Sequence, residues 1–258
     1  MHWNGSRWQT APTPKVGGRH SQTRLVAVDT IAPDDAWAVG SRETTQFPEP
    51  VILRWNGMKW RQVTNGCGAE LSGLTSFGAD DVWAVGGPSS CHWDGRRWTA
   101  IPIDQPDPRV IIDLRDVDGV SSDDLWAVGA RFVDCGEGEC VTGAIQHYDG
   151  SAWTQISTPA PSLESVRAIA RDDVWAVGFG GVSIWHYDGS TWSEVPAPDL
   201  AGNGQAALRA IDASGPGDLW AVGPQLVGTP VGASLALHAR AFHSGAVVGS
   251  TGGACVVG

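Results

Sequence analysis

The sequence predicts an all-β fold, a β-propeller of about five four-stranded blades, and three observations carry this prediction. Two short motifs each recur five times along the 258 residues. The tryptophans of the first motif are spaced about 45 residues apart, which matches the length of one propeller blade. Turn-forming residues are abundant, with 34 Gly and 16 Pro, as expected for many short strands joined by tight turns.

The first motif is Asp-Asp-X-Trp-Ala-Val-Gly, with Gly-Asp in place of the acidic pair in the last copy. Its tryptophans are Trp37, Trp83, Trp126, Trp175 and Trp220. A leucine stands twelve residues before each of them, so the strand register is constant. We expect the leucine in the first strand of each blade, the tryptophan in the second, and the acidic pair in the turn between them. Alternation in the second strand sends Trp and Val to one face and smaller residues to the other, so that neighbouring blades can pack closely.

The second motif is an aromatic residue, Asn or Asp, Gly, two variable residues and Trp. It occupies residues 3–8, 55–60, 93–98, 148–153 and 187–192. Asn-Gly and Asp-Gly are strong hairpin signals, because both residues tolerate positive φ. This motif is therefore predicted to join the third and fourth strands of each blade.

The repeats predict one propeller domain over residues 1–238, followed by a poorly ordered or aberrant tail at residues 239–258. The chain starts with a third-and-fourth-strand hairpin at residues 2–12, and the last repeat lacks the second motif. We expect this hairpin to complete the last blade and close the ring; the alternative is that the chain is a fragment of a longer protein. The blades are predicted at about residues 24–64, 70–102, 112–157, 163–196 and 207–238.

Composition excludes several classes of function. The chain has 28 acidic and 17 basic residues, and the basic ones are scattered, which argues against nucleic-acid binding. It contains no apolar run long enough for membrane insertion, and no signal peptide is present in this chain. No phosphate-binding loop, nucleophile elbow or zinc-protease motif occurs, so we expect no cofactor and no enzymatic activity.

The five cysteines allow two disulfides. Cys67 and Cys91 flank the first two strands of one repeat, and Cys135 and Cys140 bracket a four-residue loop. Zinc is the alternative, but a lone pair of cysteines without a second pair or a nearby histidine does not make a zinc site, so no metal is predicted. Disulfides favour an extracellular or cell-surface location.

The two motifs together resemble a family of exported repeat proteins of soil bacteria, whose blades read DDVWAVG followed by ILHWDGTRWS. The resemblance covers about residues 1–238; it implies a propeller fold and export but no particular activity. The hairpin at residues 188–192 also resembles the Asp-box of sialidase-type propellers, although it lacks the residue between Asp and Gly. Five Trp-rich blades of this length are similar to the tachylectin-type lectins, which bind amino sugars between blades, but fold alone does not imply function.

Aromatic residues beside Asn-Gly or Asp-Gly turns are candidates for stacking on a sugar ring. The candidate ligand-binding residues are Trp55, Trp93, Tyr148, Trp185 and Tyr187. Their alternative role is in the core, since they stand at fixed repeat positions. Five histidines also share one repeat position, just before the hairpin aromatic, and are expected to be structural or at the surface.

Acidic residues in the first strands are candidates for a central channel. Asp29, Asp118 and Asp212 stand eight residues before their second-strand tryptophans, and the first strand is innermost in a propeller. Three acids near one axis can hold a cation through oxygen ligands. The alternative is that they are solvated polar residues in a wet channel.

The connections between second and third strands vary most in length. They are long at residues 41–50, 130–142 and 224–232, and variable loops on a constant scaffold usually carry binding specificity. The candidate binding residues there are Phe47, Arg131 and Phe132.

These observations predict a monomeric, non-enzymatic binding module for a protein or glycan ligand. One alternative is a multivalent lectin that repeats a weak site on several blades. Another is a propeller glycosidase or lyase, which would need unique acids near the channel axis that break the repeat.

Overall fold

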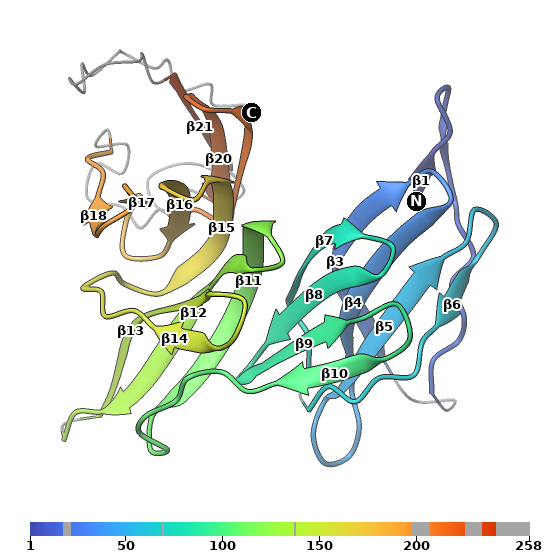
Figure 1. The fold of residues 1–258 in the computed structure, drawn as a ribbon, viewed down its shortest axis with the longest axis horizontal. Coiled ribbons are helices and arrows are strands. Elements are labelled where there is room, and N and C mark those ends of the chain that lie inside the picture. Colours follow the sequence, from blue (N-terminus) through green and yellow to red (C-terminus); the bar gives the residue numbers. More distant parts are fainter. Residues whose placement is uncertain (18–21, 69, 137, 198–206, 225–233, 241–258) are drawn as a thin grey trace. The chain divides into compact units, whose positions relative to one another are not determined.

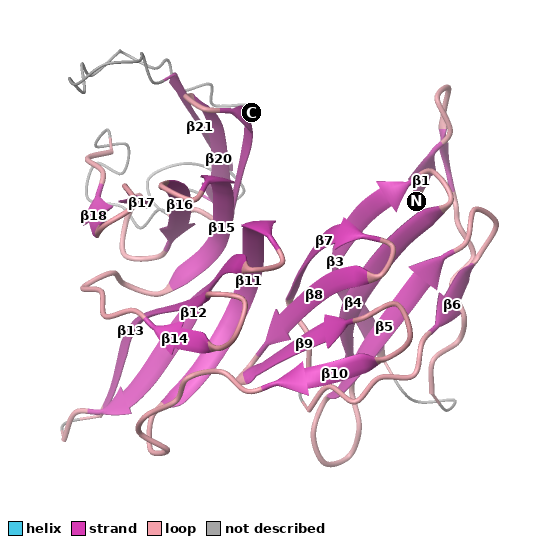
Figure 2. Cartoon of the chain, viewed as in Figure 1, coloured by secondary structure: helices cyan, strands magenta, loops and turns pink. Residues whose placement is uncertain are grey.

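The computed structural model describes the chain except residues 18–21, 69, 137, 198–206, 225–233 and 241–258. Every regular element within the described residues is a β-strand (Figure 2), which confirms the all-β prediction. None of these residues forms a helix with the length and hydropathy of a membrane span. The chain divides into two compact units, residues 1–102 and residues 103–258. Most of the predicted tail and of the connection at 224–232 lies outside the described residues.

The first unit contains a hairpin and two four-stranded antiparallel sheets (Figure 1). The hairpin pairs β1 (His2–Trp3) with β2 (Trp8–Gln9). The first sheet contains β3 (Thr23–Ala32), β4 (Asp35–Arg42), β5 (Glu49–Trp55) and β6 (Trp60–Gln62). The second contains β7 (Gly73–Gly78), β8 (Asp81–Gly86), β9 (Ser89–Trp93) and β10 (Trp98–Ile101). Each strand pairs with the next along the chain, as in a propeller blade.

The second unit contains two four-stranded sheets and one sheet of three described strands. The first contains β11 (Ile111–Ser121), β12 (Asp124–Asp134), β13 (Glu139–Tyr148) and β14 (Trp153–Gln155). The next contains β15 (Leu163–Ala170), β16 (Asp173–Gly178), β17 (Ser183–Tyr187) and β18 (Trp192–Glu194). The last contains β19 (Ala210–Gly215), β20 (Asp218–Pro224) and β21 (Ser234–Arg240). Completion of this last sheet by the N-terminal hairpin stays a prediction, as does the single domain over residues 1–238.

The predicted hairpin turns are present in every complete blade. In the turn between β9 and β10, the Asp94 carboxylate accepts hydrogen bonds from the N–H groups of Arg96 (2.9 Å) and Arg97 (2.8 Å), and Gly95 has a φ of 86°. The equivalent side chains that accept the same pair of bonds are Asn56, Asp149 and Asp188. The motif thus forms the turn because a short polar side chain replaces backbone partners and glycine supplies the positive φ.

The glycine that ends the first motif is explained by close backbone approach. A Cβ on Gly129 would lie 1.9 Å from the carbonyl oxygen of Asp113 on the neighbouring first strand. The same geometry recurs at Gly40, Gly86, Gly178 and Gly223, where the distance is 1.9–2.1 Å. Any side chain at this position would push the first and second strands apart.

Neighbouring blades within each unit pack large residues against small ones, as predicted. In the first unit, Trp37 and Val39 share a buried cluster with Ala84 of the following sheet. In the second unit, Trp126 and Val128 share one with Ala176. The core of each unit therefore lies between neighbouring sheets.

Tryptophans of the two motifs also meet across the blade interface. The ring of Trp37 lies 5.1 Å from Trp93 and 5.4 Å from Trp98, both in the hairpin of the following blade. In the second unit, Trp126 lies 4.7 Å from Tyr187 and 5.4 Å from Trp192. Each such second-strand Trp is thus covered by the aromatic pair of the next blade, in the tilted and edge-on geometries that aromatic rings prefer.

Candidate functional site

One hairpin of the second unit is longer than its counterparts. Strands β12 and β13 contain 11 and 10 residues, whereas β16 and β17, at the same place in the next blade, contain 6 and 5. The connection predicted at residues 130–142 is therefore mostly strand, and Arg131 and Phe132 lie in β12 instead of in a loop. The reason is cross-strand pairing, because the ladder continues to the pair Asp134 and Glu139. We call β12 and β13 together the long hairpin.

A disulfide closes the tip of the long hairpin. Cys135 and Cys140 are bonded, with their Cα atoms 5.9 Å apart, and the N–H of Cys135 donates to the carbonyl of Gly138 at 3.1 Å. The Asp134 carboxylate accepts a hydrogen bond from the N–H of Gly136 at 2.9 Å. These bonds restrict the conformations of the tip, so the hairpin beyond the blade is held in shape. The other predicted pair, Cys67 and Cys91, is also bonded in the structure.

Three apolar side chains form a row across one face of the long hairpin and β11. Phe132 stands opposite Ile111 on β11 and opposite Val141 on β13, so all three project from the same face. Ile111 is 61% exposed and Val141 47%, while Phe132 is half-buried between them. Nearer the blade, Ala130 on the same face is buried. This apolar row is thus the exposed continuation of a face that elsewhere packs in the core.

Two carboxylates lie next to the apolar row on the same face. Asp134 and Glu139 stand directly opposite each other at the tip, and both are exposed. Like charges in this position destabilise a strand pair. A cation placed between them would relieve that repulsion, so the acidic pair favours a basic ligand group.

The other loop candidate, Phe47, is in the first unit. It is 80% exposed in the connection between β4 and β5, where the hydroxyl of Thr44 donates to its carbonyl at 2.7 Å. An ion pair between Arg42 and Glu49 closes the base of this connection. Phe47 is therefore accessible, but no second large apolar side chain of the described residues in this connection accompanies it.

The predicted ligand-binding aromatics lie in the core. Trp55, Trp93, Tyr148 and Trp185 are buried and Tyr187 is half-buried. The indole N–H groups of Trp55 and Trp93 donate to the carbonyls of Pro33 and Ala79, both at 3.2 Å. This burial favours the alternative role in the core that the sequence left open, and the sugar-stacking role stays a prediction. A repeated aromatic next to a turn has two possible faces, and sequence alone does not say which one is covered.

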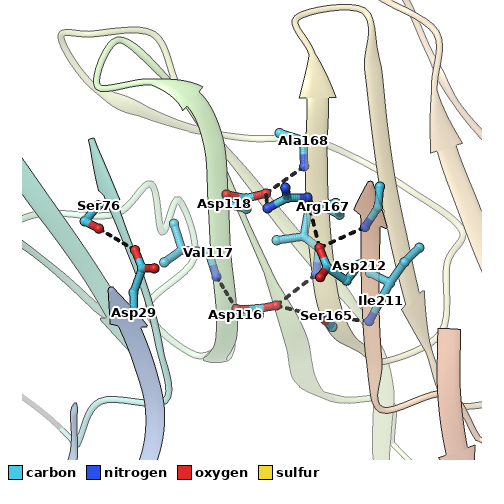
Figure 3. Close-up of polar contacts among 12 residues, drawn as sticks. Asp29, Ser76, Asp116, Val117, Asp118, Ser165, Arg167, Ala168, Ile211 and Asp212 are labelled. Carbon is cyan, nitrogen blue, oxygen red and sulfur yellow. Dashed lines mark hydrogen bonds and ion pairs between the residues drawn. The ribbon is translucent and has the colours of Figure 1, made fainter. Parts of the chain in front are cut away.

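The first-strand acids connect neighbouring blades (Figure 3). The Asp118 carboxylate accepts from the N–H of Ala168 at 2.9 Å and pairs with Arg167 at 3.3 Å, and Arg167 in turn lies 3.4 Å from Asp212. In the first unit, Asp29 accepts a hydrogen bond from Ser76 of the following blade. No cluster of His, Cys, Asp or Glu in the described part of the chain is arranged to hold a metal ion. These acids thus act as cross-links between first strands.

Asp116 is the one acid at its repeat position. The other copies have Ala27, Gly73, Ser165 and Ala210 there. Its carboxylate accepts hydrogen bonds from the hydroxyl of Ser165 (2.7 Å) and from the N–H groups of Val166 (3.0 Å) and Val117 (2.9 Å). Burial, partly offset by these bonds, raises the pKa of Asp116 to about 6. The carboxyl of Asp116 therefore connects β11 to β15 through its hydrogen bonds to Ser165 and Val166.

This shift predicts a pH dependence of stability. An aspartate in the unfolded chain titrates near pH 4, so between about pH 4 and pH 6 the native protein holds a proton that the unfolded chain lacks. The stabilisation from this group is therefore complete below about pH 4 and is lost as the pH rises through about 6, by up to about 3 kcal/mol. Urea unfolding of the parent and of Asp116→Asn across this range should show the parent losing stability relative to the variant as the pH rises. A difference that does not vary with pH would contradict the shift.

Sequence reasoning missed a contact that explains the repeated histidines. His92 Nε2 hydrogen-bonds the second acid of the Asp pair, Asp81, at 2.9 Å, and its ring stacks on Trp83 with centroids 4.4 Å apart. The same three-residue contact joins His147 to Asp124 and Trp126, His186 to Asp173 and Trp175, and His238 to Asp218 and Trp220. In the first blade Arg54 replaces the histidine; it pairs with Asp35 and covers Trp37. The signal was the constant place of each residue in its own motif, with the acid two residues before the second-strand Trp and the histidine of a complete blade directly before the hairpin aromatic. The pairing of the second and third strands then places the two residues side by side.

The sheets, turns and blade contacts define the class of the fold as a β-propeller. No family model and no curated protein matches the chain. Among 68 matching chains of solved structures is the extracellular domain of a hybrid two-component system, BT4673, from B. thetaiotaomicron. It is 12% identical with a TM-score of 0.57, and the match covers 92% of this chain but 30% of that one. This likeness supports the propeller fold and extends no further.

Two other matches have lower TM-scores. A structure of YCF48 bound to a D1 peptide is 14% identical with a TM-score of 0.34, covering 84% of this chain and 97% of that one. The extracellular domain of a second hybrid system of B. thetaiotaomicron, BT3049, is 10% identical with a TM-score of 0.41, covering 83% and 33%. The soil-bacterial repeat family that the motifs resemble is not among the matches described.

Proposed function

We propose that this chain is a non-enzymatic, monomeric binding module that holds a protein partner through the long hairpin. The observation that carries this proposal is the exposed apolar row of Ile111, Phe132 and Val141 on a disulfide-closed extension of one blade. An exposed apolar patch rimmed by charged residues is typical of a protein–protein contact. The extension breaks the repeat, as a feature selected for one specific contact would.

We also propose that the module works outside the cell or at the cell surface. The two disulfides support this location, since disulfides persist in oxidising compartments. The disulfide between Cys135 and Cys140 closes the long hairpin, on which the proposed binding depends. The proposed location and the proposed function therefore rest on the same structural feature.

The two alternative functions have less support from the side chains. A multivalent lectin needs accessible aromatic rings on several blades. The five aromatic residues that the sequence suggested for this role are buried or half-buried. A glycosidase or lyase needs a unique acid such as Asp116, whose carboxylate is bonded by Ser165 and two backbone N–H groups.

Site-specific photo-cross-linking tests the proposed function. The variant Phe132→p-benzoylphenylalanine, irradiated with the surface and medium fractions of the producing cells, should form a discrete adduct with one protein. The same photoreactive residue at the exposed Glu194 of β18 serves as the control and should not give that adduct. Excess parent protein should compete for the adduct, while Ile111→Lys, which places a charge in the apolar row, should compete at least about tenfold less well. Identical adducts at both positions, or equal competition by both proteins, would refute the assignment.

A further inference from the structure

The outer edge of β13 is only partly paired. Backbone groups at alternate residues of this strand point away from β12. The backbone groups of His147 face β14. The carbonyl of Ile145 accepts a hydrogen bond from the N–H of Ile156 at 2.9 Å, and the N–H of Gly143 donates one to the carbonyl of Ala160 at 2.8 Å. Along the described chain this series of bonds ends at Gly143. No described residue bonds to the outward-facing N–H and C=O groups of the next two residues, Val141 and Glu139, so the strand edge is open there with respect to the described chain.

This open edge borders the apolar row and the acidic pair. Val141 belongs to the row and Glu139 to the pair, and both side chains project from the same face of the hairpin. A strand that paired with this edge would place alternate side chains on that face, one beside Val141 and one, two residues away, beside Glu139. Backbone bonds would supply affinity and these two side-chain positions would supply specificity.

We propose that the partner contributes an extended peptide segment that adds a strand to β13 along residues 139–142, with an apolar side chain against Val141 and a basic one against Glu139 and Asp134. This inference rests on the proposed function and names the chemistry of the partner's segment. The repulsion between the two opposed carboxylates specifies the basic group. The disulfide between Cys135 and Cys140 holds the edge in its extended form before binding, which lowers the entropic cost of association.

Peptide binding to the full chain tests this inference. The probe is a fluorescent synthetic peptide that alternates threonine with valine and has a lysine two positions from its central valine; binding is followed by fluorescence anisotropy. The parent protein should bind it. A peptide of the same sequence with alternate backbone amides N-methylated should not bind, because it cannot donate to the edge. Replacing its lysine with glutamate should weaken binding at least about tenfold.

Two adjacent substitutions on β13 provide matched variants. Val141→Lys changes the face and edge that the peptide would contact, and should weaken binding at least about tenfold. Thr142→Lys adds the same charge on the opposite face, at a residue whose backbone groups point toward β12, and should leave binding within about twofold of the parent. Both residues are exposed, so neither change disturbs the core.

The outcomes separate this inference from the proposed function. Equal binding of the methylated peptide, equal weakening by the two lysine variants, or no binding of the probe would each overturn strand addition. A specific cross-link from position 132 in the same protein would still support a binding role for the apolar row. Peptide binding without any specific cross-link would support the open edge and remove the proposed partner contact.

Discussion

Replacing Trp126 by alanine is expected to lower the free energy of unfolding by about 3–5 kcal/mol, the usual cost of removing a buried aromatic side chain from a core. Trp126 is 2% exposed, stacks on His147, and contacts Tyr187 and Trp192 of the following blade. Its removal leaves a cavity between two sheets that rigid strands cannot close. Urea unfolding followed by tryptophan fluorescence and circular dichroism measures the loss.

Trp220→Ala is the matched control for this prediction. Trp220 occupies the same repeat position and stacks on His238 at 4.1 Å, but its side chain is 49% exposed. Its replacement should cost no more than about 1.5 kcal/mol. An equal loss for both variants would contradict the exposure of the Trp220 ring. A loss below about 1 kcal/mol for Trp126→Ala would contradict the aromatic core between blades.

Gly129→Ala is expected to destabilise the protein by at least about 1–3 kcal/mol, although it adds a single methyl group. The new Cβ would lie 1.9 Å from the carbonyl oxygen of Asp113, so β11 and β12 must separate. Gly215→Ala is the control, since no atom lies within 4 Å of a Cβ there and its φ is not positive. That change should alter stability by no more than about 0.5 kcal/mol. If the melting temperatures of the two variants decreased by the same amount, close approach of the first-strand backbone would not be the reason for the repeated glycine.

The sequence was sufficient to predict the strands, the turns and the packing between blades, because these depend on local chemistry repeated in constant register. Asp94 and Gly95, for example, form a turn through hydrogen bonds and a positive φ that depend only on these neighbouring residues. The alternation of Trp and Val with smaller residues reflects the period of a strand. Five copies of each signal also removed the ambiguity that a single copy would have left.

The candidate site was only partly predicted, for physical reasons that differ between residues. Phe132 was predicted as a binding residue, but in a loop, because the sequence between Val133 and Val141 contains glycines and acids that are typical of a turn. In the structure the two strands extend into this region because the disulfide and the backbone hydrogen bonds between the strands hold them together. Ile111 was missed because it becomes a neighbour of Phe132 only through the register of β11 against β12.

Trp93 is buried, which favours the core role that the sequence analysis gave as its alternative. Its residue type suits both a sugar platform and a core, and the covering ring, Trp37, belongs to another repeat. The acids Asp118 and Asp212 were placed correctly in first strands, yet their role depends on Arg167, which lies between them. Partners that come from a different blade are set by the fold, so composition and spacing do not disclose them.

In each unit, one pair of neighbouring blades meets through two different surfaces, because the second-strand Trp of one blade faces the hairpin aromatics of the next. In the language of symmetry this is a heterologous contact, like that between subunits of a head-to-tail filament. Duplication of a blade-length segment therefore produces a copy that already fits on both sides, and each added copy contributes a nearest-neighbour increment of stability. Proteins of this design can gain or lose whole blades in evolution without having to acquire a new interface.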